Sequence, residues 1–340
     1  MAQEMNRQIR LAATPDGIPT EEHFTLAETA VVPPADGEIL CRNLFLSLDP
    51  YMRSQIAGRH MSGSIAPGDV LKGETVAEII ESRHPDYSTG DKVIVPGGWQ
   101  THTTLAPQPD APPPMATRRL NPAIYPMSLA LGALGMPGLT AYAGLKHLGQ
   151  PKAGDVLVVS AASGAVGSMV GQFAKSLGCT VIGIAGNPDK CKWLMETADF
   201  DGCINYKEEA VADGLDRLCP KGVDIYFDNV GGEILDAVAW RLAIGARVIL
   251  CGLISKVNST EPVVGPSPGA FIKARATVRG LVVYDFWDQM DDMAETFMAL
   301  IEAGKMHFLE DISDGIEKAP AAFVRLMHGK NHGKTIIKLL

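Results

Sequence analysis

The stretch DVLVVSAASGAVGSMVGQFAKSLGCTVIGIAGNPDK occupies residues 155–190 and decides how the chain folds. It opens with an apolar, β-branched run at Val156–Val159, which predicts a buried strand. A turn rich in small residues leads into a segment of helical periodicity that reaches Leu177, and a second apolar run follows at Thr180–Ile184. The order strand, turn, helix, strand predicts a βαβ unit with two parallel strands.

The turn between the first strand and the helix, ASGAVG at residues 162–167, is suited to holding phosphate groups. Gly164 lacks a Cβ, so its backbone can approach a pyrophosphate, and Gly167 lets the helix lie close to its strand. The N–H groups that open the helix, with the positive end of its dipole, face an anion bound there. The turn departs from G-x-G-x-x-G only at Ala162, which indicates a dinucleotide site. The alternative is a glycine-rich turn that binds nothing.

The end of the second strand indicates which dinucleotide is bound. NAD-binding proteins place an acidic side chain about 20 residues after the first glycine, where it binds the ribose 2′-hydroxyl. Here Ala185 and Gly186 occupy that place, and Lys190 follows in the first turn of the next predicted helix. Without a carboxylate, a 2′-phosphate meets no repulsion, and Lys190 can supply the counter-charge. This favours NADP(H) over NAD(H); the alternative is that Lys190 is an ordinary solvated lysine.

The composition is that of a globular protein. Of the 340 residues, 46% are hydrophobic and 20% are charged, and the length allows two domains. The net charge of −9 argues against a nucleic-acid partner. The first residues, MAQEMNRQIRL, have no apolar core, and no apolar run reaches about 18 residues. We therefore expect a soluble, cytoplasmic protein that does not enter a membrane.

The cysteines and histidines show no metal-binding pattern. Six cysteines stand at positions 41, 179, 191, 203, 219 and 251, with no C-x-x-C pair among them. The eight histidines are scattered, and H-E-x-x-H does not occur. Because metal sites need ligands at such spacings, we expect no metal ion and six reduced, packed thiols.

The two halves of the chain differ in pattern. Runs at residues 39–48, 70–80 and 92–95 predict strands, separated by Gly-Asp and Pro-Gly-Asp turns. Because no helical pattern separates them, we expect an antiparallel barrel or sandwich in this half. After residue 189, helices and strands alternate up to a β run at 276–283. This alternation predicts a doubly wound parallel sheet with ligands at the carboxyl ends of its strands.

Three segments flank these regions. Between residues 125 and 149 a glycine-rich helical pattern predicts a helix broken by a turn at Met136-Pro137-Gly138. An amphipathic helix is predicted at 291–304. In the tail, a helix at 316–328 precedes a strand at 334–339. Because no helix follows that strand, we expect it to pair with the first half of the chain.

Seven motifs follow one another in unbroken order. They are SLDPYMR at 47–53, LGMPGLTAY at 134–142, AASGAVGS at 161–168, GCTVIGIAGNPDKC at 178–191, FDNVGGEILDAV at 227–238, CGLIS at 251–255 and GKNHGKTIIK at 329–338. Together they resemble the zinc-independent branch of the medium-chain dehydrogenase/reductases, and within it the NADPH-dependent alkenal/one reductases. That group includes prostaglandin reductases, plant double-bond reductases and bacterial curcumin reductase. The resemblance covers nearly the whole chain.

The resemblance implies an α/β protein of two domains with a cleft between them. Residues 1–125 and 311–340 would form a GroES-like β-barrel catalytic domain, and residues 126–310 a Rossmann NADP-binding domain with a doubly wound parallel sheet. It also implies a homodimer. Gly73-Glu74-Thr75 stands where zinc-binding relatives have Gly-His-Glu. The resemblance therefore implies a protein without zinc.

The resemblance also implies roles for individual residues. The pyrophosphate would be cradled by Gly164, Ala165, Val166 and Gly167. The 2′-phosphate would meet Lys190 and Tyr206. Tyr51, Met136 and Pro137 would face the substrate. Met136 and Pro137 would also contact the cofactor. The other residues expected to line the cofactor are Thr140, Gly186, Asn229, Cys251, Gly252, Ser255, Leu281, Val282, Val283 and Asn331.

One position departs from the family pattern. The family commonly reads G-x-I-S-x-Y-N, with the tyrosine beside the nicotinamide ribose as proton donor or enolate stabiliser. Residues 252–258 read GLISKVN, so Val257 replaces that tyrosine. Valine cannot donate a hydrogen bond. The proton must then come from Tyr51, Tyr284, water or the ribose hydroxyl, or the substrate differs from the family's usual one.

The resemblance implies an enzyme that reduces the C=C bond of α,β-unsaturated ketones and aldehydes with NADPH and without a metal. Hydride would reach the β-carbon, negative charge would build up as an enolate, and the α-carbon would then be protonated. Two alternatives stay open. One is a quinone or carbonyl reductase on the same scaffold, and the other is an NADPH-binding protein with weakened catalysis.

Overall fold

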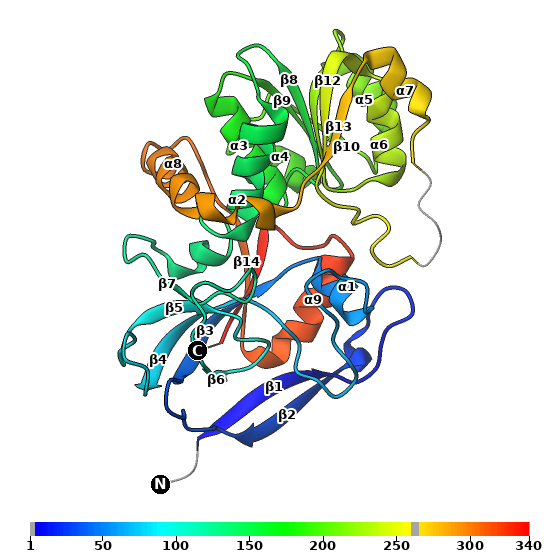
Figure 1. The fold of residues 1–340 in the computed structure, drawn as a ribbon. Helices are drawn as coiled ribbons and strands as arrows, with labels where there is room; N and C mark the ends of the chain where they lie inside the picture. Colours follow the sequence, from blue (N-terminus) through cyan, green and yellow to red (C-terminus); the bar gives the residue numbers. More distant parts are fainter. Residues whose placement is uncertain (1–3, 260–264, 340) are drawn as a thin grey trace. The chain divides into compact units, whose positions relative to one another are not determined.

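The chain forms two compact units in the computed structural model, which describes residues 4–259 and 265–339 (Figure 1). The first unit comprises residues 1–132 and 310–340, and the second comprises residues 133–309. The domain boundaries were predicted after residues 125 and 310, and the two compact units divide close to these positions, after residues 132 and 309. The first unit is mainly β, whereas strands and helices alternate in the second, which confirms the predicted α/β class.

A six-stranded parallel sheet forms the centre of the second unit, in the order β10-β9-β8-β11-β12-β13. Its strands are β8 (Val156–Ser160), β9 (Thr180–Ala185), β10 (Gly202–Asn205), β11 (Val223–Asp228), β12 (Leu242–Leu250) and β13 (Thr277–Gly280). The chain runs outward from β8 to β10, returns to β11 beside β8, and then runs outward to β13. This reversal is the switch point of a doubly wound sheet, and it confirms the predicted Rossmann arrangement.

Helices cover both faces of this sheet (Figure 1). They are α3 (Ala165–Ser176), α4 (Pro188–Glu196), α5 (Val211–Leu218), α6 (Gly232–Ala239) and α7 (Pro268–Ala274), whereas α8 (Met290–Glu302) packs on other helical segments of this unit. One buried cluster contains Val158, Ile182 and Ile204 from three neighbouring strands, together with Leu215 of α5. Such strands, buried on both faces, read as continuous apolar runs, which explains why the sequence pattern identified them.

The glycine-rich segment after residue 125 differs from its prediction. Met136-Pro137-Gly138 does not form a turn but opens α2 (Met136–Ala143), which continues into the π-helical η3 (Gly144–Gly149). Pro137 is tolerated there because the N–H groups of a first helical turn have no intrahelical partner. Gly138 is required by packing, since a Cβ would lie 1.9 Å from the carbonyl oxygen of Ala133.

The first unit contains a two-stranded and a seven-stranded sheet. Antiparallel β1 (Met5–Leu11) and β2 (Phe24–Ala30) form the smaller one. The larger has the order β14-β15-β3-β4-β5-β7, and β6 also pairs with β3. Its strands are β3 (Ile39–Leu48), β4 (Thr75–Ser82), β5 (Lys92–Val95), β6 (His102–Leu105), β7 (Arg118–Arg119), β14 (Glu310–Asp314) and β15 (Lys334–Lys338).

Short elements of the first unit contradict the sequence prediction. A 3-10 turn, η1 (Glu21–His23), and α1 (Met52–Ile56) interrupt the strands, so the expected absence of helices is wrong. One helical turn is too short to produce a recognisable periodicity. The strand predicted at 70–80 begins only at Thr75. Strand β14 was not predicted, because its sequence EDISD is rich in acidic residues, which strands disfavour.

The C-terminal tail belongs to the first unit. After the short helix η5 (Ile316–Lys318) and α9 (Ala319–Met327), β15 pairs with β3 in antiparallel register. The predicted pairing of the tail with the first half is therefore confirmed. Lys334 Nζ donates to Asp49 Oδ1 at 2.5 Å and to the carbonyl oxygen of Leu48 at 3.0 Å. Both side chains of this ion pair are buried, with 4% and 8% exposed.

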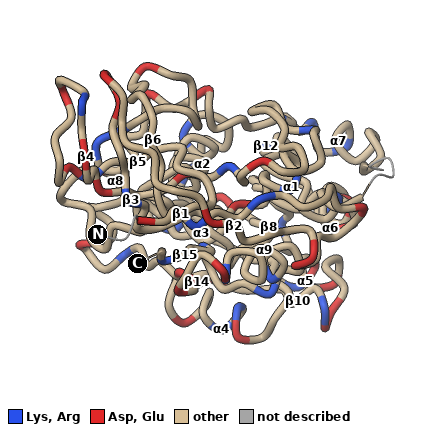
Figure 2. The backbone as a smooth tube through the Cα atoms, turned by 90° about the horizontal axis from the view of Figure 1, so that it is seen from below, with Lys and Arg blue, Asp and Glu red and all other residues tan. Residues whose placement is uncertain are grey.

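Charged residues are interspersed along the chain, with Lys and Arg lying among Asp and Glu (Figure 2). Many of them are paired, as in the Arg241–Asp216 and Arg247–Asp155 ion pairs, both at 2.7 Å. Among the helices of residues 4–259 and 265–339, none has the length and apolar character needed to cross a membrane.

The buried ion pair of the tail generates a prediction about stability. Replacing Lys334 with Met leaves the Asp49 carboxylate buried without a cation, which costs roughly 3–5 kcal/mol of unfolding free energy. The Asp49→Asn/Lys334→Met double variant removes the charge and is expected to recover most of that loss. Urea denaturation of the three proteins checks this. Equal stability of the single and double variants would show that the pair does not hold β15 in place.

Candidate active site

The turn between β8 and α3 is tight and strained. Ala161 adopts a left-handed φ of 48°, which non-glycine residues seldom do. Its carbonyl oxygen accepts a hydrogen bond from the Gly164 N–H at 2.9 Å. A Cβ at Gly167 would lie 2.4 Å from that same oxygen, so only glycine fits there. The predicted strand-turn-helix arrangement is therefore present, and its second glycine is required by close packing.

The amino end of α3 has the properties of a pyrophosphate site. The N–H groups of Ala165, Val166 and Gly167 stand in the first helical turn, where helix geometry supplies no acceptor. Within the described part of the chain, no side chain caps this end of the helix. A Cβ at Gly164 would meet only the Ala161 oxygen, at 3.1 Å, so the space above it is otherwise open. The turn thus fits an anionic diphosphate.

Three residues that the sequence predicts to line the cofactor lie after the ends of β9 and β10. The Tyr206 ring lies against Gly186, since a Cβ there would be 2.6 Å from the Cε1 atom of Tyr206. The Tyr206 N–H donates to the carbonyl oxygen of Ala185 at 3.1 Å, which fixes the ring beside the strand end. Lys190 lies in the first turn of α4, which Asn187 caps by accepting from the Asp189 N–H at 2.7 Å.

A buried carboxylate joins the ends of β8 and β11. Asp228 is fully buried, and its Oδ1 accepts hydrogen bonds from Ser160 Oγ at 3.0 Å and Tyr226 Oη at 2.8 Å. The same oxygen accepts from the Val230 and Gly231 N–H groups at 3.0 and 2.9 Å. Asp228 and Ser160 were not predicted as site residues from the sequence. The only available signal was their position at the carboxyl ends of two predicted strands.

The predicted residues after β11 and β12 are brought together by hydrogen bonds to the backbone around Asp228. Asn229 Nδ2 donates to the carbonyl oxygen of Ser160 at 2.8 Å. The Cys251 and Gly252 N–H groups donate to the carbonyl oxygen of Asp228 at 2.8 and 3.1 Å. Ser255 Oγ donates to the carbonyl oxygen of Val230 at 2.6 Å. The structure therefore gathers Asn229, Cys251, Gly252 and Ser255 beside the end of β11.

The Cys251 thiol in this group is not a nucleophile. Burial, followed by the charge of the neighbouring Asp228, raises its pKa to about 12. Burial likewise raises the pKa of Tyr226 well above its usual value, followed by the charge of Asp228. Both groups therefore keep their protons at neutral pH, and Tyr226 remains a donor to the carboxylate.

The remaining predicted residues of the second unit lie on two segments. Met136, Pro137 and Thr140 share α2, where Thr140 Oγ1 donates to the carbonyl oxygen of Met136 at 2.7 Å. Leu281 donates its N–H to the carbonyl oxygen of Leu250 at 2.9 Å. The residues that follow are Val282 and then Val283 and Tyr284 in η4 (Val283–Gln289). The Tyr284 ring makes an edge contact with Trp287, with centroids 6.3 Å apart.

Tyr51 and Asn331 belong to the first unit. Tyr51 immediately precedes α1, and its ring centroid lies 5.0 Å from that of His60. Burial lowers the pKa of His60, so its ring is neutral at pH 7. Asn331 Nδ2 donates to the carbonyl oxygen of Gly333 at 2.8 Å.

The side chains of Glu74 and Thr75, which stand where zinc-binding relatives have a zinc ligand, bind other side chains of the first unit. Glu74 forms an ion pair with Arg118 at 2.5 Å, and Thr75 Oγ1 donates to Asn43 Oδ1 at 3.1 Å. Among residues 4–259 and 265–339, no three His, Cys, Asp or Glu side chains are grouped so that they could hold a metal ion.

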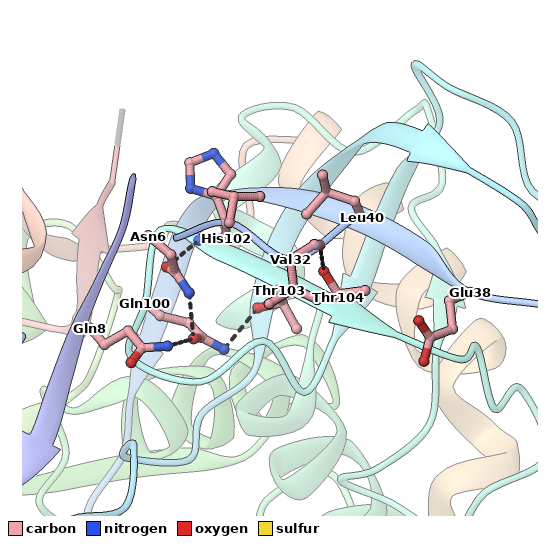
Figure 3. A pocket seen from close by; sticks show the side chains of 10 residues that line it. Asn6, Gln8, Val32, Glu38, Leu40, Gln100, His102, Thr103 and Thr104 are labelled. Atoms are coloured by element: carbon pink, nitrogen blue, oxygen red, sulfur yellow. Dashed lines mark hydrogen bonds between the residues drawn. The ribbon is translucent and has the colours of Figure 1, made fainter. Parts of the chain in front are cut away.

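A cavity of about 290 Å³ in the first unit is not lined by any of the predicted site residues (Figure 3). Its lining residues are Asn6, Gln8, Val31, Val32, Glu38, Leu40, Gln100, His102, Thr103 and Thr104. The amide groups satisfy one another, since Asn6 and Gln8 donate to Gln100 Oε1 at 3.0 and 2.8 Å. Gln100 in turn donates to Gly97 and Thr103. We assign no ligand to this cavity.

Two family descriptions match the chain. Residues 7–110 match the N-terminal domain of oxidoreductase, and residues 165–302 match zinc-binding dehydrogenase. The first match falls in the first unit and the second in the second unit. Together they agree with the two-part organisation that the motifs predict.

Relatives that match the full length of the chain identify the family more closely than these two domain descriptions do. The chain is 40% identical to the NADPH-dependent curcumin reductase of Escherichia coli (strain K12), a match that covers 99% of this chain and 97% of the relative. It is 38% identical to the NADP(+)-dependent 2-alkenal reductase of Nicotiana tabacum, over 99% and 98% of the two chains. The crystal structure of CurA from Vibrio vulnificus in complex with NADPH is similar, with a TM-score of 0.92 and 40% identity over 98% and 99% of the chains. The chain therefore belongs to the zinc-independent medium-chain dehydrogenase/reductase family, in its branch of NADPH-dependent alkenal/one reductases.

Proposed function

We propose that this protein is an enzyme that uses NADPH to reduce the C=C bond of α,β-unsaturated ketones and aldehydes. The observation that carries the proposal is the full-length similarity to an NADPH-dependent curcumin reductase and a 2-alkenal reductase. The residues expected to bind the cofactor support it, because the turn before α3 and the ends of β9 and β10 fit the phosphates of NADPH.

The second unit is proposed to hold the cofactor at the carboxyl ends of its strands. Residues 164–167 would bind the pyrophosphate through their backbone N–H groups. Lys190 and Tyr206 would bind the 2′-phosphate. Asn229 and the segment 251–255, held together around Asp228, would line the nicotinamide half. When bound, NADPH supplies a hydride from nicotinamide C4 to the β-carbon of the substrate.

The protein must then stabilise charge on the substrate and deliver a proton. Reduction at the β-carbon places negative charge on the carbonyl oxygen as an enolate, and a hydrogen-bond donor aimed at that oxygen lowers the barrier. Val257 cannot provide such a donor. We propose Tyr51 as the donor, with Tyr284 as the second candidate, because each carries a phenolic hydroxyl.

We also propose that the protein is a cytoplasmic homodimer. Strand β13 lies at the edge of the six-stranded sheet, and all four of its residues are exposed. Ile244 and Ile272 are 76% and 74% exposed on the neighbouring β12 and α7. An open sheet edge flanked by apolar side chains favours coverage by a second copy.

The cysteines support the proposed cytoplasmic location. A reducing compartment would keep all six cysteines as thiols, which is how they occur here.

The reaction product tests the proposed function directly. Incubation of an enone with NADPH and the enzyme is expected to yield the saturated ketone, because hydride attacks the β-carbon. Gas chromatography with mass spectrometry separates this product from the allylic alcohol, and a quinone assay detects hydroquinone. Formation of allylic alcohol, or turnover of quinones alone, would instead make the protein a carbonyl or quinone reductase. Tight NADPH binding without turnover of any alkene would indicate a binding protein.

The coenzyme preference is expected to depend on Lys190. Lys190→Glu places a negative charge beside the 2′-phosphate, so the KM for NADPH should rise about tenfold or more, equivalent to about 1.4 kcal/mol. The KM for NADH should change less than about twofold. Lys192→Glu is the matched control, because Lys192 lies on the same helix with its side chain 69% exposed. Equal effects of Lys190→Glu on both coenzymes would remove this role.

The proton donor is tested by removing single hydroxyl groups. Tyr51→Phe is expected to lower kcat for enones by about a hundredfold, the usual effect of losing one oxyanion donor, and to leave the KM for NADPH unchanged. Tyr284→Phe should keep most of the activity. The opposite pattern would transfer the role to Tyr284, and two fully active variants would leave water or the ribose hydroxyl as the proton source.

A further inference from the structure

The aromatic ring of Tyr51, proposed above as the proton donor, lies beside an imidazole. Its centroid is 5.0 Å from that of His60, and the two ring planes are tilted by 32°. Tyr51 immediately precedes α1, and His60 lies in the turn segment that follows this helix. Both residues are half-buried. Tyr51 is therefore partly accessible, as a residue that contacts a substrate must be.

The imidazole of His60 is held by its own turn. The Ser62 N–H donates to His60 Nδ1 at 3.1 Å, and Ser62 Oγ lies 2.7 Å from the same nitrogen. Because a backbone N–H can only donate, Nδ1 is an acceptor, and the proton of the neutral ring lies on Nε2. The Gly63 N–H donates to the carbonyl oxygen of His60 at 3.1 Å and closes the turn. The orientation of the imidazole is therefore fixed.

A buried amide group of α1 holds Ser62. Gln55 is 2% exposed, and its Nε2 donates to Ser62 Oγ at 2.8 Å. Since Ser62 Oγ accepts this hydrogen bond, its own proton is available for His60 Nδ1. The carbonyl oxygen of Gln55 also accepts from the Ile65 N–H at 3.1 Å. These bonds fold the segment 57–65 back on α1.

The short helix α1 is itself anchored. Arg53 is 2% exposed, and its Nη2 donates to the carbonyl oxygens of Pro15 and Gly17 at 3.2 and 2.7 Å. A helix of five residues has little stability of its own, so such bonds are needed to hold it in place. A continuous series of contacts thus leads from the buried side of α1 through His60 to the Tyr51 ring.

We propose that His60 is a positioning residue for Tyr51, which it holds in the orientation from which the phenol hydroxyl donates to the substrate. This inference rests on the proposed function, in which Tyr51 supplies the proton. A phenol side chain can rotate around two bonds, and a donor contributes to catalysis only when it is aimed at the developing charge. Contact with a fixed imidazole restricts the ring to one orientation. Because Val257 replaces the tyrosine common in the family, the aim of Tyr51 matters more in this chain.

Enzyme kinetics with an enone separates this role from a merely structural one. His60→Ala is expected to lower kcat about tenfold, because a misdirected donor loses most of its effect, and to leave the KM for NADPH unchanged. His60→Phe keeps an aromatic ring beside Tyr51 and should retain most of the wild-type kcat. His84→Ala is the matched control, because His84 packs against another tyrosine of the first unit, Tyr87, with centroids 5.1 Å apart. It should leave kcat unchanged.

A double-mutant cycle tests whether His60 acts through Tyr51. In the Tyr51→Phe background, His60→Ala should lower kcat by less than about twofold, because no hydroxyl remains to be aimed. Multiplicative losses in the double variant would overturn the proposal, as would equal losses in His60→Phe and His60→Ala. A fully active Tyr51→Phe variant would also overturn it and would leave the reduction of the C=C bond itself established.

Fluorine NMR gives a readout that does not depend on turnover. The protein is labelled with 3-fluorotyrosine at its seven tyrosines, and the Tyr51 signal is identified by its loss in Tyr51→Phe. In His60→Ala this signal is expected to move toward that of free 3-fluorotyrosine, because the ring then adopts several orientations in water. In His60→Phe it should remain well separated from that value.

An unchanged Tyr51 signal in His60→Ala would overturn the proposal. If the wild-type protein reduces no enone, the proposed function fails, whereas the spectrum still decides whether His60 fixes the ring.

Discussion

The arrangement of the candidate site depends on one buried carboxylate. Asp228 is fully buried, and a charge in such a place costs several kcal/mol unless donors surround it. Four donors converge on its Oδ1 oxygen, two from the side chains of Ser160 and Tyr226 and two from the backbone after β11. Its backbone carbonyl oxygen also accepts from the residues that follow β12. Three strand ends are thereby fixed to one another.

This constraint explains why residues far apart in the chain can serve one cofactor. The turn that begins at Ala161 follows β8, Asn229 follows β11, and the segment 251–255 follows β12. All three lie at the carboxyl edge of the parallel sheet, which is where doubly wound folds bind ligands. Gly186 and Tyr206 extend the same edge across β9 and β10. The proposed positions of pyrophosphate, 2′-phosphate and nicotinamide therefore follow the order of the strands.

The sequence predicted those features that depend on long, regular patterns. The apolar run of β8, the glycine turn and the helical period of α3 identified the Rossmann unit, because strands buried on both faces carry continuous apolar residues. Features that depend on tertiary contact could not be predicted. Strand β14 is acidic and exists through its pairing with β15, and Gly138 is dictated by the distant carbonyl of Ala133. The partners of Asp228 likewise appear only when the strands are placed side by side.

The proposed chemistry is tested most directly by following the transferred hydrogen. NADPH that carries deuterium in the transferable position of nicotinamide C4 is incubated with the enzyme and an open-chain α,β-unsaturated ketone in ordinary water. Conjugate reduction predicts a saturated ketone with one deuterium on the β-carbon and a solvent proton on the α-carbon. Deuterium on the carbonyl carbon, or a saturated product without deuterium, would contradict the account.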